Sequence, residues 1–223
     1  MLNQMATAFS GSRVVHSVQI FGNATWHAGS LEDSGTATLT ASTDGSSQMQ
    51  LLLDASGQRT ETQIGSGSTA ICQWSGADGV VHTANSANCW KPAVWFLPVL
   101  SLQPSLLPSN LEITDLGAGT VGSGETIYRH LRSQFVLTDL SVSTTANLTQ
   151  QSTIDVGVNP TSLLPAVFAY SVRPDKGAQT PIAIEIRYSD YRVVDGVQVP
   201  FLIQRYVSGA LQLAIAVSSA EIS

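Results

Sequence analysis

Three glycines, Gly117, Gly119 and Gly122, stand in the spacing G-x-G-x-x-G within the stretch DLGAGTVGSGE. In dinucleotide-binding proteins this spacing follows a strand and opens a helix that receives the pyrophosphate, and an acidic residue about 20 positions later contacts the ribose. Here ETIYRHLRSQFVLTDL follows, which fits a strand as well as a helix, while Asp139 comes early for the ribose and Asp155 late. We therefore expect the glycines to bend and link two antiparallel strands, and we predict no cofactor.

The chain has two cysteines, Cys72 and Cys89, with His82 between them. This group comes nearest to a zinc ligand set, but no C-x-x-C or H-E-x-x-H accompanies it, so we predict no metal site. In an exported protein the two cysteines can form a disulfide across the intervening hairpin, whereas in the cytosol they would be buried thiols. The sequence also lacks the G-x-S-x-G elbow of a serine hydrolase.

The segment YSDYR gathers two tyrosines, an acid and a base. On a strand Tyr188, Asp190 and Arg192 would share one face, where Asp190 can pair with Arg192 or Arg187. Charges clustered in this way stabilise a hairpin more often than they perform acid–base catalysis. We therefore predict that the protein is not an enzyme and assign no catalytic residue.

The composition indicates many strands and turns and few long helices. Only 12% of the 223 residues are charged, against roughly a quarter in an average soluble protein. The net charge is -6 and the ten basic residues are scattered, which argues against a nucleic-acid partner. A chain of this length can bury a full core, and we predict a single domain over residues 1–223.

The pattern of apolar residues predicts the elements that must position any site. Residues 2–9 fit a short helix that Gly11 ends, and alternating segments follow, separated by turns such as TDGSS, GADG, VDGV and VSGA. These turns divide the chain into roughly ten or eleven antiparallel strands. The apolar, proline-rich segment 91–110 lacks alternation, so we expect one or two short helices or a loop over the sheet. The predicted fold class is α+β.

Several short motifs resemble bacterial outer-membrane lipoprotein-sorting proteins of the LolA/LolB-like superfamily. The pattern is a hairpin of the form Y.DYR.VDGV..P, preceded by a D....L.P segment that turns into the next strand. In this chain the positions are Asp155, Leu163, Pro165, Tyr188, Asp190, Tyr191, Arg192, Asp195, Gly196, Val197 and Pro200, and the early VVHSVQIFGNATW adds to the likeness.

The resemblance implies a strongly curved, unclosed antiparallel sheet, or half-barrel, covered by short helices around an apolar cavity. The cavity of the characterised carriers shelters the acyl chains of lipoproteins. The middle segment departs from the pattern because it is rich in proline and tryptophan, and we do not align the basic residue or the protruding apolar loop of the characterised carriers. The predicted lining residues are Trp26, Trp95, Phe96, Leu97, Leu100, Leu102, Leu106, Phe168 and Phe201.

The resemblance also implies a periplasmic protein that binds an acyl chain or lipoprotein lipid, possesses no cofactor, and makes transient contact with the membrane or with envelope proteins. The opening MLNQMATAFSGSR has neither the basic segment nor the apolar run of a signal peptide, so we expect the export signal outside this chain. The alternative is a structural or protein-interaction domain of an envelope complex. In that alternative the apolar residues above are ordinary core and no cavity remains.

Overall fold

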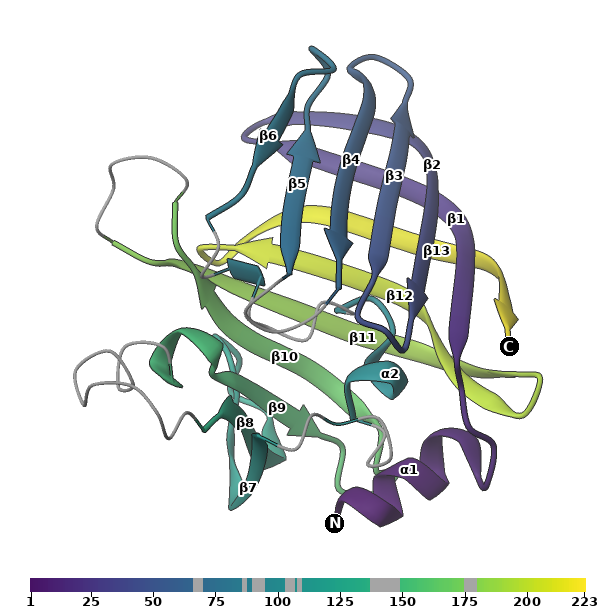
Figure 1. Ribbon diagram of the computed structural model, residues 1–223, viewed down its shortest axis with the longest axis vertical. Helices are drawn as coiled ribbons and strands as arrows, with labels where there is room; N and C mark the ends of the chain where they lie inside the picture. The colour runs from purple at the N-terminus through teal and green to yellow at the C-terminus, as the bar shows by residue number, and fades with distance from the viewer. Residues whose placement is uncertain are drawn as a thin grey trace.

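The computed structural model describes residues 1–65, 70–85, 88–89, 95–102, 107, 110–136, 149–174 and 180–223. These residues form one sheet and short helices, among them α1 (Leu2–Ser10) and α2 (Pro98–Leu102) (Figure 1). The strands are β1 (Ser17–Ala28), β2 (Leu31–Ser42), β3 (Ser47–Leu53), β4 (Gly57–Ile64), β5 (Ile71–Ser75), β6 (Val81–Thr83), β7 (Leu111–Thr120), β8 (Ile127–Phe135), β9 (Ile154–Val158), β10 (Pro165–Val172), β11 (Ile182–Val194), β12 (Val197–Val207) and β13 (Ala210–Ile222).

The thirteen strands lie in the order β6-β5-β4-β3-β2-β1-β13-β12-β11-β10-β9-β8-β7. Each pairs antiparallel with its neighbours, and β1 joins the C-terminal strand β13 at the centre. Among the described strands β6 and β7 are the two edges, so the sheet is open. Figure 1 shows it curling strongly, with β3–β6 passing across β11–β13. The predicted curved, unclosed antiparallel sheet is confirmed.

The sheet has thirteen strands where the turn pattern predicted ten or eleven. The difference arises where the pattern is weakest. The GADG turn already separates β5 from the three-residue β6, and the sequence of β8 fits a helix as well as a strand, so the predicted count depends on whether such short or ambiguous segments are included. In the structure β8 is a strand that pairs with β7 on one side and β9 on the other, so its backbone N–H and C=O groups form hydrogen bonds on both sides.

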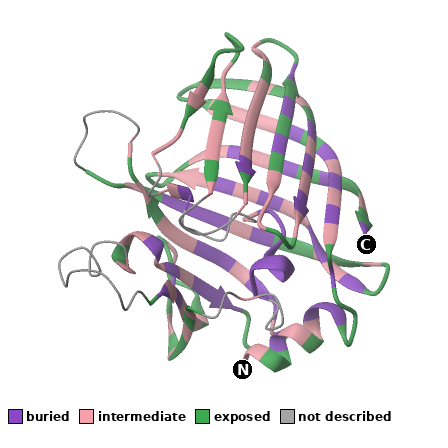
Figure 2. Ribbon diagram, viewed as in Figure 1, coloured by how far each residue is buried: buried purple, intermediate pink, exposed green. Residues whose placement is uncertain are grey.

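Alternation places one side of each strand in the core. On β3 the buried residues are Met49, Leu51 and Leu53, and the residues between them are exposed. Figure 2 shows buried positions recurring at every second residue along part of β2 as well, where intermediate positions lie between them. The buried side defines the inner face of the curled sheet, on which the core and the candidate site both lie.

The C-terminal hairpins use the turns that the sequence predicts. At Asp195-Gly196, between β11 and β12, both residues have positive φ, 50° and 82°. At Ser208-Gly209, between β12 and β13, the values are 51° and 83°. Two successive positive φ angles characterise the type I′ turn, whose twist matches that of the joined strands.

Gly22 lies at an irregularity of the first strand. The register of β1 against β13 shifts between Phe21 and Gly22. A Cβ at Gly22 would lie 2.5 Å from the backbone oxygen of Ala216, so only glycine permits the close approach.

The glycine-rich stretch is a strand, a bulge and a turn. Gly117, with φ of 87°, lies in β7 where the register against β8 shifts, and Gly122, with φ of 73°, lies in the turn before β8. An antiparallel strand follows, where a dinucleotide site would need a helix. The expectation that these glycines bend and link strands is therefore confirmed.

The helix predicted over residues 2–9 is α1, and Gly11 with φ of 61° caps its C-terminus. It buries Met5 and Phe9 and packs against α2 and β12. Helix α2 begins at Pro98, a residue suited to a first helical turn, and lies within the curve of the sheet with all five residues buried (Figures 1 and 2). No described helix has the length and apolar character needed to cross a membrane.

Candidate functional site

A pocket with a volume of about 660 Å³ lies on the inner face, between β4–β5 and the facing ends of β10–β12. Because the sheet curls, strands far apart in its order face each other here, and Glu61 of β4 contacts Arg205 of β12. The described apolar and aromatic residues of the lining are Trp26, Met49, Trp74, Trp95, Phe96, Ile154, Phe168, Tyr170, Val172, Ile182, Ile184 and Val207.

Two arginines lie against the indole of Trp26 in the pocket wall. The Arg59 guanidinium carbon is 4.7 Å from the ring centroid and that of Arg205 is 5.7 Å away. Arg205 also stacks on Trp95, at 5.3 Å. Such cation–π contacts hold a guanidinium in place while leaving its N–H groups available to an acceptor.

Arg205 is buried, with 7% of its surface exposed, and pairs through Nη1 with Glu61 at 2.7 Å. The Nε atoms of Arg205 and Arg59 are buried and have no hydrogen-bond partner among the described atoms. A buried donor without a partner is uncommon, because its desolvation is not offset. Both arginines line the pocket, so a ligand acceptor can approach their guanidinium groups.

Strand register explains why charged groups enter an otherwise apolar face. Arg59 and Glu61 stand opposite Leu51 and Met49 of β3, so they share the side that is buried on β3. Glu61 is also opposite Trp74 of β5. Moving from β3 to β4, the inner face changes from aliphatic to charged, and residues of both strands line the pocket.

The disulfide Cys72–Cys89 is present, with Cα atoms 5.7 Å apart, and it ties the loop containing Asn88 to β5. The Asn88 side chain joins this loop to Arg173 just beyond β10: its Oδ1 accepts from the Arg173 N–H at 2.7 Å, and its Nδ2 donates to the Arg173 carbonyl at 2.7 Å. Cys72, Asn88 and Arg173 all line the pocket. The disulfide and the asparagine therefore fix one wall.

The predicted lining residues fall into four groups. Trp26, Trp95, Phe96 and Phe168 come together around the pocket. Leu97, Leu100 and Leu102 are buried in the core with α2 and do not border the described pocket. Phe201 lies under the Arg192 guanidinium at 4.3 Å, away from the described lining, and Leu106 lies outside the described residues. A role in ligand binding stays a prediction for all nine.

Sequence analysis missed the charged residues of the pocket, Arg59, Glu61, Arg173 and Arg205. The alternation in QRTETQI already places Arg59, Glu61 and Gln63 on one side of a strand. The approach of β12 to β4 depends on the curl of the whole sheet, so the pairing of Arg205 with Glu61 has no local sequence pattern.

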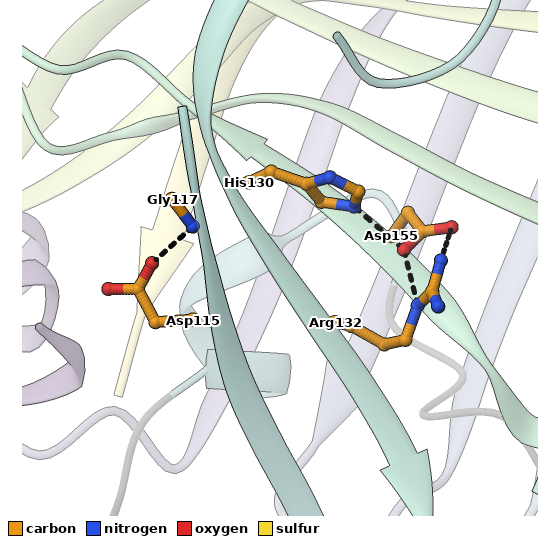
Figure 3. A network of polar contacts seen from close by, with 5 residues as sticks. All are labelled: Asp115, Gly117, His130, Arg132 and Asp155. Carbon is orange, nitrogen blue, oxygen red and sulfur yellow. Dashed lines mark hydrogen bonds and ion pairs between the residues drawn. The ribbon is translucent and has the colours of Figure 1, made fainter. Parts of the chain in front are cut away.

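A second polar cluster lies on β7–β9, where Asp155 accepts hydrogen bonds from two neighbours (Figure 3). His130 Nε2 is 2.8 Å and Arg132 Nε is 2.9 Å from Asp155 Oδ1. Nearby, Asp115 accepts from the Gly117 amide at 3.0 Å and pairs with Arg129 at 2.6 Å. Arg132 and Asp155 are directly opposite in the register of β8 and β9, so this is a cross-strand network.

The His130–Asp155 pair resembles two members of a catalytic triad. In the described part of the chain no serine, threonine or cysteine side chain bonds to His130. Burial acts to raise the pKa of the Asp155 carboxyl, but hydrogen bonds from Arg132 and His130 outweigh it and leave the pKa below its ordinary value. The two hydrogen bonds hold this carboxylate in its ionised form within the cross-strand network.

The YSDYR segment has the ion pair that its sequence predicts, with Arg192 Nη2 at 2.6 Å from Asp190. Arg187 instead pairs with Glu185 at 2.5 Å. Tyr188 is buried and its hydroxyl donates to the carbonyl of Trp95, while Asp190 with φ of 52° interrupts the alternation, so the two do not share a face. Across the described residues, no group of His, Cys, Asp and Glu is arranged to bind a metal ion.

No protein-family model matches the chain, and no curated protein matches its sequence. Solved structures do match its fold. An outer membrane lipoprotein-sorting protein domain from Vibrio parahaemolyticus aligns with a TM-score of 0.57 and 7% identity, covering 100% of this chain and 91% of the other. A LolA superfamily protein from Nitrosomonas europaea aligns at 0.54 and 10%, covering 100% and 92%. A DUF1329 family protein from Desulfovibrio piger aligns at 0.56 and 9%, covering 100% and 90%.

The fold is therefore an open, curved antiparallel half-barrel of the kind found in lipoprotein-sorting domains. The resemblance to the LolA/LolB-like superfamily is confirmed at the level of the fold. At this identity the likeness extends to architecture and not to activity.

Proposed function

We propose that this protein is a non-enzymatic binding protein that shelters an apolar ligand, such as an acyl chain or lipoprotein lipid, in the inner-face pocket. The observation that carries the proposal is the pocket of about 660 Å³ whose wall includes Trp26, Trp95 and Phe168. Ligand sites are typically concave, mostly apolar and within this range of volumes. The segment from Trp95 through α2 would act as the cover over the sheet.

Removal of apolar surface from water would drive binding, at about 0.8 kcal/mol for each buried methylene. The fold shared with lipoprotein-sorting domains supports a place in the cell envelope, and the Cys72–Cys89 disulfide is consistent with an oxidising compartment such as the periplasm. On this proposal residues 1–223 act as one domain, and partners are lipid or acylated protein with transient membrane or envelope contacts.

Native mass spectrometry of the protein purified from a bacterial periplasm, followed by organic extraction, tests the proposal. A discrete added mass that extracts as lipid supports it and identifies the ligand class. An apo mass that persists after incubation with phospholipid vesicles would instead favour an interaction domain with a filled core.

A matched pair of variants locates the site. Val207 lines the pocket, so Val207→Trp should fill part of it and weaken binding of the neutral dye N-phenyl-1-naphthylamine about tenfold or more. Val193 is 64% exposed near the far end of β11, so Val193→Trp should leave dye binding unchanged. Equal binding by both variants and the wild type would remove this pocket from the proposal.

A further inference from the structure

We infer that the pocket selects an amphiphile with an anionic oxygen head group, a carboxylate or a phosphate, which binds Arg59 and Arg205 while its chain occupies the apolar wall. The inference rests on the proposed function and adds the charge of the ligand. Nothing in the fold alone requires this charge, because an apolar pocket holds a neutral chain equally well.

The first observation is the charge of the lining. The chain has sixteen acidic and ten basic residues and a net charge of -6. Yet the described pocket wall includes three arginines, Arg59, Arg173 and Arg205, against a single acid, Glu61. The pocket is therefore locally positive within an acidic protein, and low-dielectric walls strengthen the attraction of such a site for anions.

The second observation is that the arginines have donors to spare. Glu61 neutralises Arg205 through Nη1, and the Nε atom of Arg205 remains buried without a partner. Arg59 has no ion-pair partner within 4.0 Å among the described residues, and its buried Nε is also without a partner. A planar guanidinium fork presents paired donors that match the two oxygens of a carboxylate or phosphate.

No described acid forms an ion pair with Arg59. Asp33 is close enough for its pKa to be lowered slightly by Arg59, but the hydrogen bonds of Ser56 and the Ala55 amide lower that pKa more. The Asp33 oxygens accept from the Ala55 and Ser56 amides at 3.0 and 2.7 Å. The third arginine, Arg173, faces the neutral side-chain amide of Gln151. With the amide turned so that its oxygen faces the guanidinium, this oxygen accepts a hydrogen bond from Arg173 Nη2 at 2.9 Å.

The third observation is the arrangement of charged and apolar walls. Arg59 and Arg205 both lie against the Trp26 ring and both line the pocket, so their two guanidinium groups border the same part of it. Apolar side chains of the sheet continue the lining, among them Met49, Ile154, Phe168, Ile184 and Val207. A head group at the arginines therefore leaves its chain in contact with aliphatic and aromatic surface.

Displacement of N-phenyl-1-naphthylamine tests the inference with ligands that share one chain length. Dodecanoate should displace the dye at about a tenfold lower concentration than neutral 1-dodecanol, since a charge-assisted hydrogen bond contributes about that factor. Monododecyl phosphate, compared with dodecanoate, shows which anionic head the site prefers. Acetate at the same concentrations should displace no dye, because it has no chain to bury.

Arg59→Gln should reduce the preference for dodecanoate over dodecanol to within about threefold, as expected when only screened charges remain. Arg192 is the matched control, because it also stacks on an aromatic ring, that of Phe201, but lies near the far end of β11 from the pocket. Arg192→Gln should keep the full preference.

Glu61→Gln shifts the preference in the opposite direction. The substitution removes the one acid of the described lining, while the glutamine amide oxygen can still accept a hydrogen bond from Arg205. Dodecanoate should therefore bind more tightly, and the affinity for dodecanol should stay unchanged. Equal displacement by dodecanoate and dodecanol, or a preference that survives Arg59→Gln, overturns the inference and leaves the proposed function intact. Failure of both the dye and dodecanol to bind overturns the proposed function itself.

Discussion

The polar cluster on β7–β9 and the wall of the pocket both contain arginines and acids, but the arginines are paired differently in the two regions. On β7–β9 each arginine has a carboxylate: Arg129 pairs with Asp115, and Arg132 with Asp155. In the pocket wall Glu61 pairs with Arg205, whereas Arg59 lies against the face of Trp26 and has no ion-pair partner among the described residues. Paired cross-strand charges stabilise a sheet, whereas unpaired donors beside apolar surface suit a ligand.

The difference follows from position in the sheet. Arg132 and Asp155 are direct cross-strand neighbours, so local register suffices to pair them. Arg205 and Glu61 belong to strands that are far apart in the sheet order and meet only because the sheet curls. The curl therefore brings together charged residues that are not all paired by cross-strand neighbours. Four predictions test the pocket wall, the segment beside it and the β7–β9 cluster.

The largest effect is expected from the disulfide that holds the pocket wall. Replacing both Cys72 and Cys89 by Ser should lower the free energy of unfolding by about 3 kcal/mol, since the bond closes a loop with a sequence separation of 17. Urea denaturation measures the change, and the wild type in reducing agent should match the variant. An unchanged urea midpoint in both would show that the bond does not restrain the loop.

A pair of double-mutant cycles compares the two regions directly. The coupling between Arg205 and Glu61, measured with glutamine at each position, should be about 2 kcal/mol because Arg205 is buried. The coupling between Arg132 and Asp155 should stay below about 1 kcal/mol, because the Arg132 side chain is 42% exposed to screening solvent. A larger coupling on β7–β9 than in the pocket would contradict the distinction.

Tyr188 links the segment that begins at Trp95 to the sheet, because its hydroxyl donates to the Trp95 carbonyl. Tyr188→Phe should lower stability by about 1 kcal/mol and speed amide exchange near Phe96. Tyr191→Phe is the control, since its hydroxyl donates to Pro165 at 2.8 Å and should not affect exchange at Phe96. Equal amide-exchange rates near Phe96 in the two variants would show that the Tyr188 hydroxyl does not hold the segment that begins at Trp95.

The smallest effect is the acid dependence of the β7–β9 cluster. Because the pKa of Asp155 is lowered, the ionised carboxylate stabilises the fold above the ordinary value of 3.8, and this contribution is lost as pH falls through the folded pKa. Asp155→Asn should therefore cost less than about 1 kcal/mol at pH 7. The gap from the wild type should close below about pH 4, which unfolding curves at several pH values measure.

The sequence predicted the strands and the aromatic part of the pocket lining. Alternation and turn residues such as Asp195-Gly196 identify the hairpins, and Gly22 marks the irregularity of β1, because these features depend on neighbours in the chain. Four aromatic lining residues, including Trp26 and Trp95, were also predicted, from their apolar character and the resemblance. Their contribution to binding remains to be measured.

The charged part of the site depends on contacts between distant strands. Arg205 and Glu61 are separated by 144 positions in sequence, so no local pattern relates them. Leu97, Leu100 and Leu102 look like lining residues in the sequence, but they pack in the core with α2, because apolar character does not distinguish a filled interior from an open one.

Isoleucine methyl NMR during titration with 1-dodecanol tests the central claim most directly. Ile154, Ile182 and Ile184 line the pocket, whereas Ile20 and Ile215 are fully buried in the closed core. We expect saturable shifts of the three pocket methyls and unchanged core methyls. Shifts confined to the core methyls, or no shift at any concentration, would contradict a ligand site in this pocket.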